Sequence, residues 1–244
     1  MLVKSKLKYI QSLGQKKFRK EEGLFIAEGP KLVKELLEEE GVNVKEIYAL
    51  KDWIDENKEL LISRDVTEIS AFELEKISLL ATPNKVLALV KQFDNTSSIT
   101  TKGKITLVLD DIQDPGNLGT IIRIGDWFGV NQLVCSHGCA DVYNAKVIQS
   151  TMGSIARVRV IYTDISEWLK SQNNITVYAS SLEGKNIADM QKIKEGIIII
   201  GNESKGISPE LFALANEKIT ISKKGKAESL NAAVACGIIL SHLS

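Results

Sequence analysis

An asparagine and an arginine stand where an apolar strand passes into a helix, near the middle of the chain. Residues 107–129 read LVLDDIQDPGNLGTIIRIGDWFG, with Asn117 in a turn of small and polar residues and Arg123 six positions further on. A strand, a glycine-containing loop and a helix commonly present polar groups at the carboxyl edge of a parallel sheet. A guanidinium at such an edge could bind a phosphate or stabilise a developing negative charge.

The loop lacks the fingerprints of the common nucleotide-binding folds. The chain contains neither Gly-x-Gly-x-x-Gly nor the P-loop pattern that ends in Gly-Lys-Ser/Thr. This absence argues against a nucleotide-dependent oxidoreductase. The loop offers an amide and a guanidinium in place of a glycine-rich phosphate cradle.

Two later segments repeat the pattern of an apolar strand followed by polar residues. Residues 197–208 read IIIIGNESKGIS and carry Glu203 just beyond the strand. Residues 219–240 read ITISKKGKAESLNAAVACGIIL, and Ser229 and Asn231 stand there before an apolar helix. Because all three loops follow strands, they could converge on one edge of a sheet.

In this order, the three blocks resemble the SpoU branch of the SPOUT RNA methyltransferases. The resemblance spans roughly the last 140 residues, a range set by the positions of the motifs themselves. The matching residues are Asp114, Pro115, Asn117, Gly119, Arg123, Phe128, Gly129, Gly201, Glu203, Gly206, Ser229, Leu230 and Asn231. The chain departs from the family in the third motif, where residues 221–225 read Ile-Ser-Lys-Lys-Gly in place of the usual Ile-Pro-Met-x-Gly.

The resemblance implies an enzyme that transfers a methyl group from S-adenosylmethionine (AdoMet) to a ribose 2′-hydroxyl of ribosomal or transfer RNA, with ribosomal RNA favoured. The implied catalytic residues are Arg123, Asn117, Glu203, Ser229 and Asn231. Arg123 could act as a base if a nearby phosphate took up its proton. It could instead stay charged and stabilise the developing alkoxide, which we favour because an arginine pKa lies above about 12. Ser229 could also be an ordinary helix cap.

The resemblance also implies a binding site for AdoMet. The residues expected to line it are Ser180, Gly201, Glu203, Ile221, Leu230 and Ala232. Ile221 and Leu230 could equally be plain core residues. No metal is expected, because Cys135-Ser-His-Gly-Cys139 lacks a second ligand pair.

The N-terminal segment is a candidate RNA-binding surface. Its first twenty residues carry seven basic side chains and no acidic one, although the net charge of the whole chain is zero. The segment resembles a pattern of the family's substrate-binding domain, which implies that RNA contacts Lys16, Lys17, Arg19, Lys20 and Glu28. Phe25 belongs to the same pattern. The alternative is a solvated helix face.

The order of apolar segments predicts an α/β fold in two domains. Residues 1–92 form a small α/β RNA-binding domain, 93–104 a polar linker and 105–244 the methyltransferase domain. Strands are expected at 105–110, 132–135, 157–161, 175–180, 197–201 and 218–221, each followed by a helix. Such repeats predict a parallel sheet covered on both faces. The resemblance adds a deep C-terminal trefoil knot.

In the first domain, residues 3–20 are expected to be helical, with Gly14 as a stop, and residues 60–63 are a strand candidate. The polar stretch 93–104 is typical of a linker because it is rich in helix- and strand-breaking residues. Trp127 and Phe128 are expected to pack, because the preceding helix is apolar; the alternative is a platform on which bases stack.

Composition is that of an ordinary globular protein, with 44% hydrophobic and 25% charged residues. The three cysteines are odd in number and lie in or beside apolar segments, which favours a reducing cytoplasm. No apolar run is long enough for a membrane helix. The resemblance implies a homodimer through the C-terminal helix. A non-catalytic RNA-binding or ribosome-assembly factor with the same fold is the alternative that the altered residues 222–224 leave open.

Overall fold

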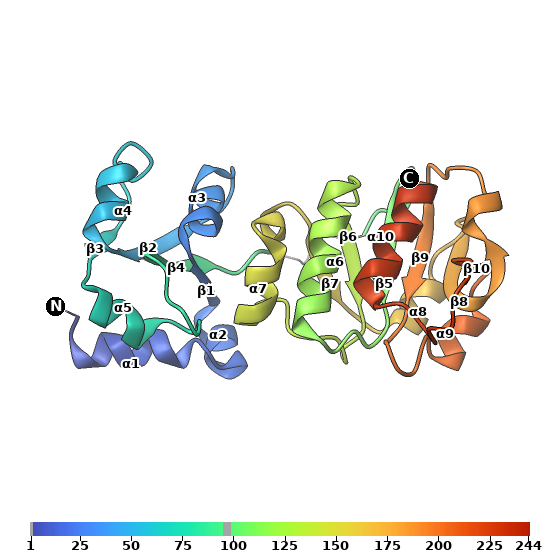
Figure 1. Ribbon diagram of the computed structural model, residues 1–244, viewed down its shortest axis with the longest axis horizontal. Helices are drawn as coiled ribbons and strands as arrows, with labels where there is room; N and C mark the ends of the chain where they lie inside the picture. The colour runs from blue at the N-terminus through green and yellow to red at the C-terminus, as the bar shows by residue number, and fades with distance from the viewer. Residues whose placement is uncertain (1, 95–98) are drawn as a thin grey trace. The chain divides into compact units, whose positions relative to one another are not determined.

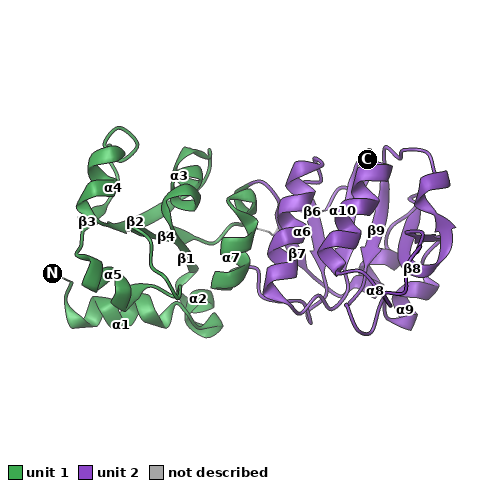
Figure 2. Ribbon diagram, viewed as in Figure 1, with its two compact units in different colours: residues 1–94, 143–156 green, residues 95–142, 157–244 purple. Residues whose placement is uncertain are grey.

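The computed structural model describes residues 2–94 and 99–244, which form two compact units (Figures 1 and 2). The first unit comprises residues 1–94 and 143–156, and the second comprises 95–142 and 157–244. The predicted linker, 93–104, includes residues 95–98, which lie outside the described residues. The two units are described separately below.

The first unit is built on a four-stranded mixed sheet with the order β1-β4-β2-β3. β4 is antiparallel to both of its neighbours, whereas β2 and β3 are parallel. The strands are β1 (Leu24–Glu28), β2 (Val44–Ala49), β3 (Val66–Glu68) and β4 (Val86–Lys91). The helices of residues 2–94 are α1 (Lys4–Ser12), α2 (Lys16–Glu22), α3 (Pro30–Glu38), α4 (Lys51–Glu56) and α5 (Ala71–Ile77). Ile10, Leu74 and Leu87 belong to a core that α1 and α5 share with the sheet.

Three local predictions for the first unit need correction. The single helix expected at 3–20 is two helices, because the chain turns at Gly14, where a Cβ would lie 3.1 Å from Leu79. The strand expected at 60–63 is wrong: these residues form turns, and Ile62 is exposed. Helix α4 was not expected, because it buries only Trp53 and so shows no apolar stripe.

Residues 143–156 pack within the first unit although they lie between two strands of the second sheet. They include α7 (Ala145–Thr151) and the short helix η1 (Ser154–Ala156). The ring of Tyr143 stacks on Phe25, with 5.1 Å between the ring centroids. Gln149 Nε2 donates to the backbone oxygen of Glu28 at 2.7 Å. The segment is therefore fixed to β1 by an aromatic stack and a hydrogen bond.

The second unit is built on a six-stranded sheet with the order β10-β8-β9-β5-β6-β7, parallel throughout. Its strands are β5 (Ile105–Leu109), β6 (Gln132–Cys135), β7 (Arg159–Tyr162), β8 (Val177–Asn186), β9 (Gly196–Ile200) and β10 (Glu217–Thr220). All six predicted strands are present, within a few residues of their expected bounds. β8 runs longer than predicted, and at its bulge a Cβ on Gly184 would lie 2.5 Å from the Lys218 carbonyl oxygen.

Helices cover both faces of this sheet, as the α/β prediction required. α8 (Ile165–Lys170) and α9 (Pro209–Ala213) pack on the face that carries Val108 and Ile199. α6 (Pro115–Trp127) lies on the opposite face, where Gly125 approaches Leu133. The C-terminal helix α10 (Ala232–Leu243) packs against α6 (Figure 1). The buried strands read as nearly continuous apolar runs because each is covered on two sides.

No helix among residues 2–94 and 99–244 is both long and apolar enough to cross a membrane.

Candidate active site

The first motif loop begins helix α6. The carboxylate of Asp114 accepts a hydrogen bond from the Asn117 backbone N–H at 2.8 Å and so caps the helix. Pro115 follows at the first helical position, where its missing N–H costs nothing. This local sequence places Asn117 in the first turn of α6, directly beyond the carboxyl end of β5.

A chain of hydrogen bonds joins the three motif loops through Asn117. The Nδ2 atom of Asn117 donates to Glu203 Oε1 at 2.5 Å, and its Oδ1 accepts from Asn231 Nδ2 at 2.9 Å. Asn231 Oδ1 in turn accepts from the backbone N–H groups of Ala233 and Val234, at 3.0 and 3.3 Å, at the start of α10. The start of α10 offers Asn231 only N–H donors, so the Oδ1 of Asn231 faces α10 and its Nδ2 faces Asn117. The amide of Asn117 is oriented in the same way, and this series of hydrogen bonds ends on the Glu203 carboxylate.

The predicted catalytic residues divide into two groups. Asn117, Glu203 and Asn231 form the network just described. Arg123 is exposed on α6, and no side chain in residues 2–94 or 99–244 makes a hydrogen bond or an ion pair with it. Ser229 is also exposed, and the cap of α10 is Asn231 instead.

A pocket of about 1200 Å³ lies beside this network within the second unit. Its lining includes all six residues expected to contact the cofactor: Ser180, Gly201, Glu203, Ile221, Leu230 and Ala232. Ile221 is half-buried and Leu230 is exposed, so neither is a plain core residue. The pocket thus has an apolar wall, and its lining also carries the carboxylates of Glu183, Glu203 and Glu228. Of these three, Glu203 belongs to the network described above.

Glycine is required where the second motif leaves β9. A Cβ at Gly201 would lie 2.4 Å from both the carbonyl carbon of Gly206 and the backbone nitrogen of Ile207. Any side chain there would force the 201–206 turn open, since real Cβ atoms do not approach backbone so closely. The glycine therefore keeps the turn closed and Glu203 on the pocket lining.

The altered part of the third motif lies on the pocket lining. Ser222, Lys223 and Lys224 all line it, and Lys223 and Lys224 are exposed. No acidic side chain in the described residues pairs with either lysine. The substitution for Pro-Met therefore adds positive charge at this rim and removes no wall of the pocket.

Two residues proposed to contact RNA are buried inside the first unit. Arg19 is 4% exposed, and its Nη1 donates to the carbonyl oxygens of Leu13 and Gly14 at 3.0 and 2.8 Å. Glu28 is 3% exposed, and its carboxylate accepts from Leu79 N–H at 2.9 Å. Burial raises the pKa of Glu28 above its ordinary value. We remove both from the RNA-facing set, because each holds a loop of its own unit.

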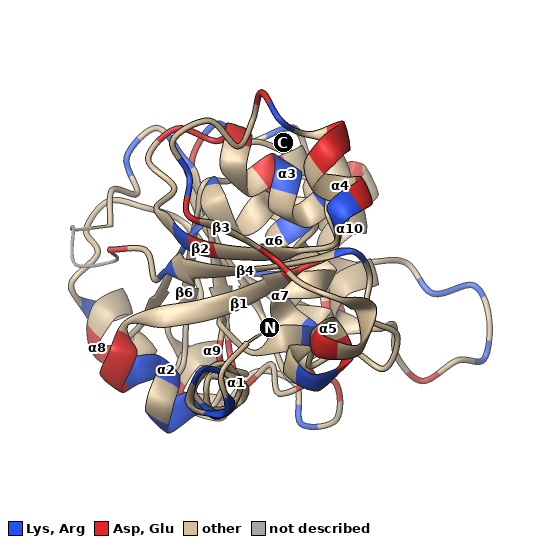
Figure 3. Cartoon of the chain, turned by 90° about the vertical axis from the view of Figure 1, so that its left-hand side faces the viewer, with Lys and Arg blue, Asp and Glu red and all other residues tan. Residues whose placement is uncertain are grey.

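The remaining basic candidates stay at the surface. Lys16, Lys17 and Lys20 are exposed on α2, and Figure 3 shows basic residues along α1 and α2. Only Lys17 has an acidic neighbour on this helix, Glu21 at 3.9 Å. An exposed pair at that distance contributes at most about 1 kcal/mol, so all three lysines are free to bind an anion.

Trp127 is exposed, although it was expected to pack. It is 85% exposed at the end of α6, one turn beyond Arg123. Phe128 is only half-buried. The exposure of Trp127 was not predicted because the sequence of α6 is largely apolar. No role was predicted for Asp110, Asp111 or Asn202; the sequence signal for the first two was an acidic pair directly after β5, and Asn202 had none.

A parallel sheet with three polar loops meeting beside a pocket at the strands' carboxyl ends defines an α/β enzyme domain. Comparisons with known proteins give its family. The family model described as the SpoU rRNA Methylase family matches residues 104–241. A model described as an MRM3-like substrate binding domain matches residues 4–88. The chain belongs to the SpoU rRNA methylase family, as the three motifs predicted.

Individual relatives match along the whole chain. The 23S rRNA (guanosine(2553)-2′-O)-methyltransferase RlmP of Bacillus subtilis is 32% identical, over 98% of this chain and 95% of the relative. A solved structure from Porphyromonas gingivalis, assigned to the TrmH family of RNA methyltransferases, is 32% identical with a TM-score of 0.86, covering 99% and 98% of the two chains. An AdoMet-bound rRNA methyltransferase from Sinorhizobium meliloti is 28% identical with a TM-score of 0.87, covering 99% and 95%.

Proposed function

We propose that this protein transfers a methyl group from AdoMet to a ribose 2′-hydroxyl of RNA, and that the RNA is ribosomal. The observation that carries the proposal is the hydrogen-bonded chain of Asn231, Asn117 and Glu203 beside the pocket. Family membership supports the reaction, and the 23S rRNA substrate in the name of the Bacillus subtilis relative favours ribosomal RNA. A ribosomal substrate places the protein in the cytoplasm.

The pocket fits AdoMet. Apolar groups such as Ile221 and Leu230 suit the adenine faces, and the close approach of backbone at Gly201 suits a ligand held by main-chain groups. The Glu203 carboxylate on the lining suits a cationic ligand. When bound, AdoMet supplies a methyl group that its positive sulfur has already activated. Ser180, Gly201, Glu203, Ile221, Leu230 and Ala232 would hold it.

The chain itself must then position the hydroxyl and help remove its proton. Holding the reacting groups in line can contribute roughly 7–11 kcal/mol, and assisted proton removal about 10²–10⁴-fold in rate. The amides of Asn117 and Asn231 have fixed orientations, so they can order the ribose without rearranging. Ser229 stands beside them with its hydroxyl exposed and can contact the substrate.

Arg123 would supply the charge stabilisation. It is exposed and unpaired in the described chain, so its five donors are available to an RNA phosphate. We favour a role in which it stays charged, binds that phosphate and stabilises the developing alkoxide. A role as a base, with the phosphate taking up its proton, is the alternative.

We further propose that the protein is a homodimer joined through α6 and α10. Trp127, Leu230 and Val234 expose apolar side chains on or beside these helices, and an apolar surface of this kind is unusual on a monomer. Ala233 and Leu240 of the same C-terminal helix are buried within the chain and do not contribute. Arg123 lies one turn from Trp127, so a dimer across this surface would bring it towards the partner's site.

Light scattering at micromolar concentration should therefore give twice the 26.9 kDa mass of the chain. Replacing the exposed Trp127 with glutamate should shift the particle towards the monomer, because a charge would be buried in an apolar interface. Replacing Ile62 with glutamate should leave the mass unchanged, because Ile62 is an exposed apolar residue of the first unit, at 71% exposure. A monomer mass for the unmodified protein would contradict the dimer.

The trefoil knot of the family is part of the same proposal. After edge strand β10 the chain returns to α6, and residue 193 near the start of β9 donates to the carbonyl oxygen of Leu243 at 2.7 Å. The chain thus passes from the edge of the sheet back to its central strands, and this path supports the proposal that the C-terminal segment is threaded through a knot. It also gives α10 a fixed position from which Asn231 can reach Asn117.

Calorimetry tests the cofactor assignment. AdoMet or its demethylated product should bind with a Kd in the micromolar range or somewhat weaker, about −8 kcal/mol or less in magnitude, and NADH should not bind. Replacing Gly201 with alanine should weaken binding, because the added Cβ has no room. No AdoMet binding at millimolar concentration, in folded protein with RNA present, would favour the non-catalytic assembly factor that the altered residues 222–224 left open.

A further inference from the structure

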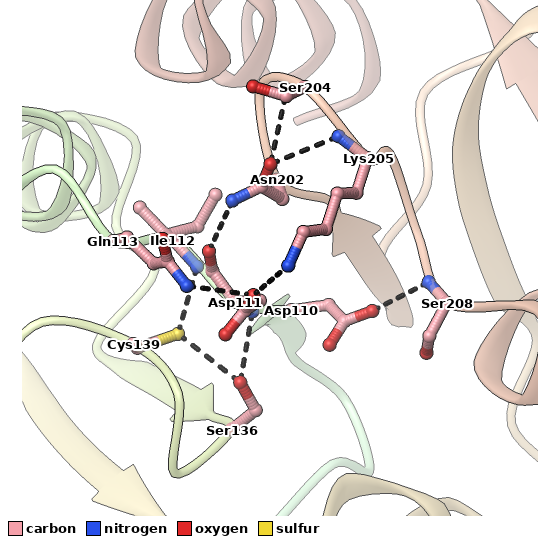
Figure 4. A network of polar contacts seen from close by, with 10 residues as sticks. All are labelled: Asp110, Asp111, Ile112, Gln113, Ser136, Cys139, Asn202, Ser204, Lys205 and Ser208. Atoms are coloured by element: carbon pink, nitrogen blue, oxygen red, sulfur yellow. Dashed lines mark hydrogen bonds and ion pairs between the residues drawn. The ribbon is translucent and has the colours of Figure 1, made fainter.

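Asn202 ties the second motif loop to the first. Its Nδ2 donates to the backbone oxygen of Asp111 at 2.8 Å (Figure 4). Its Oδ1 accepts from the backbone N–H groups of Ser204 and Lys205, at 2.9 and 3.0 Å. One side chain therefore shapes the turn that carries Glu203 and anchors that turn to the loop after β5.

The turn has little freedom apart from this anchor. Asn202 and Gly206 exchange two backbone hydrogen bonds, at 3.0 and 2.9 Å. Beyond the turn, the backbone N–H of Ser208 donates to the buried carboxylate of Asp110 at 2.8 Å. The 201–208 segment is thus held at its base by Asp110 and at its tip by Asn202.

The loop that receives the anchor is itself fixed. Asp111 adopts a left-handed conformation with φ of 59°, and its backbone N–H donates to Ser136 Oγ at 2.9 Å. The N–H of Ile112 donates to Cys139 Sγ at 3.3 Å (Figure 4). Asn202 therefore connects Glu203 to a part of the sheet edge that a third loop already holds in place.

We propose that Asn202 is a positioning residue for methyl transfer: it sets the Glu203 carboxylate against Asn117. This inference rests on the proposed function. Asn202 lines the pocket, but its side chain makes no hydrogen bond to Asn117, Glu203 or Asn231, so we assign its effect to the adjacent Glu203. The Asn117–Glu203 hydrogen bond then joins the turn that Asn202 anchors to the helix that begins just after the Asp111 loop.

The chemistry of the position requires an amide. It needs one donor for the Asp111 carbonyl oxygen and one acceptor for two backbone N–H groups. Aspartate has the acceptor but no donor when ionised, and it would face the Asp111 carbonyl with a negative charge. Alanine provides neither group, so it removes the amide's tie between the two loops and leaves the backbone hydrogen bonds of the turn, the Ser208–Asp110 contact and the Lys205–Asp111 ion pair at 3.8 Å.

The test is a double-mutant cycle in single-turnover methylation at saturating RNA and AdoMet. Asn202→Ala and Asn202→Asp should each lower the rate by up to about 10²-fold, the loss expected from a displacement of about 1 Å. In a Glu203→Gln background, Asn202→Ala should add little further loss, because the two residues act as a unit. Gln113→Ala removes a different contact to Asp111, from Gln113 Nε2 to Oδ2, and should leave the rate unchanged.

Hydrogen exchange provides a readout that does not depend on activity. In Asn202→Ala the amides of Ser204 and Lys205 should exchange faster, while the melting temperature stays near that of the unmodified protein. A full rate in Asn202→Ala, or a loss that multiplies with that of Glu203→Gln, would overturn the positioning role. If the unmodified protein is inactive, the proposed function is wrong. Unchanged amide exchange at residues 204–205 in Asn202→Ala would overturn the positioning role whether or not the protein is active.

Discussion

Replacing Arg123 with alanine should abolish methyl transfer and leave AdoMet binding close to that of the unmodified protein. Arg123 does not line the pocket, so the cofactor loses no contact. Removing one group that stabilises developing charge costs about 10²–10³-fold in rate, and more if that group also orients the phosphate. Single-turnover methylation with tritiated AdoMet measures the rate, and calorimetry measures the binding.

Thr120 provides the matched control for Arg123. It is exposed on α6 about one turn earlier, and its hydroxyl donates only to the Gly116 carbonyl oxygen of its own helix. Thr120→Ala should therefore keep the single-turnover rate. An Arg123→Ala variant that keeps most of its rate would show that the charge stabilisation comes from elsewhere.

Mixing inactive variants shows which subunit Arg123 serves. Arg123→Ala and Asn117→Ala protein, each inactive alone, should regain activity when subunits exchange, if Arg123 completes the site of the partner. In that case one of the two sites in the mixed dimer contains both intact residues. Activity that stays absent after exchange would place Arg123 and Asn117 in the same subunit's site.

Replacing Lys16, Lys17 and Lys20 together with alanine should weaken RNA binding and flatten its salt dependence. Each phosphate contact contributes about 0.7 to the logarithmic salt slope on a single strand, so three contacts contribute about 2. The single-turnover rate at saturating RNA should change little, since α2 lies in a different unit from the Asn117 network. Filter binding at several salt concentrations measures the RNA affinity and its salt dependence.

A second triple variant separates position from net charge. Lys34, Lys51 and Lys58 are exposed in the same unit, but each is paired with a carboxylate, at 3.8, 3.1 and 3.0 Å. Their removal changes the net charge by the same amount and should leave RNA affinity nearly unchanged. Equal losses in the two triple variants would mean that α2 is only a solvated helix face.

The sequence was sufficient to predict that Asn117, Glu203 and Asn231 meet. Each follows an apolar strand, and the carboxyl ends of parallel strands share one edge of a sheet. The strand pattern is strong because a strand covered on both faces must be apolar at nearly every position. The structure adds that Asn117 stands between the other two.

Buried polar residues were the main failure of prediction. Arg19 and Glu28 look like surface residues in a basic segment, yet their partners are backbone groups at 13–14 and at 79. Partners distant in sequence leave no local signal, and a buried charge is tolerated only when such partners exist. Asn202 escaped notice for the same reason, since its anchor lies 91 residues away at Asp111.

The exposure of an apolar side chain is equally invisible in one sequence. Trp127 follows an apolar helix, so a packed position was the natural prediction, but the side chain is 85% exposed. A residue that packs only against a second copy has the same local pattern as a core residue. The same holds for Leu230 and Val234, which the apolar pattern of the C-terminal helix could not separate from Ala233 and Leu240.

Mapping of ribose 2′-O-methylation across total RNA, in cells with and without the gene for this chain, tests whether the protein methylates ribosomal RNA. We expect one ribosomal RNA position to lose its 2′-O-methyl group in the deletion strain. The unmodified gene should restore it, and the Arg123→Ala gene should not. Unchanged methylation at every ribosomal and transfer RNA position, or restoration by the Arg123→Ala gene, would contradict the account.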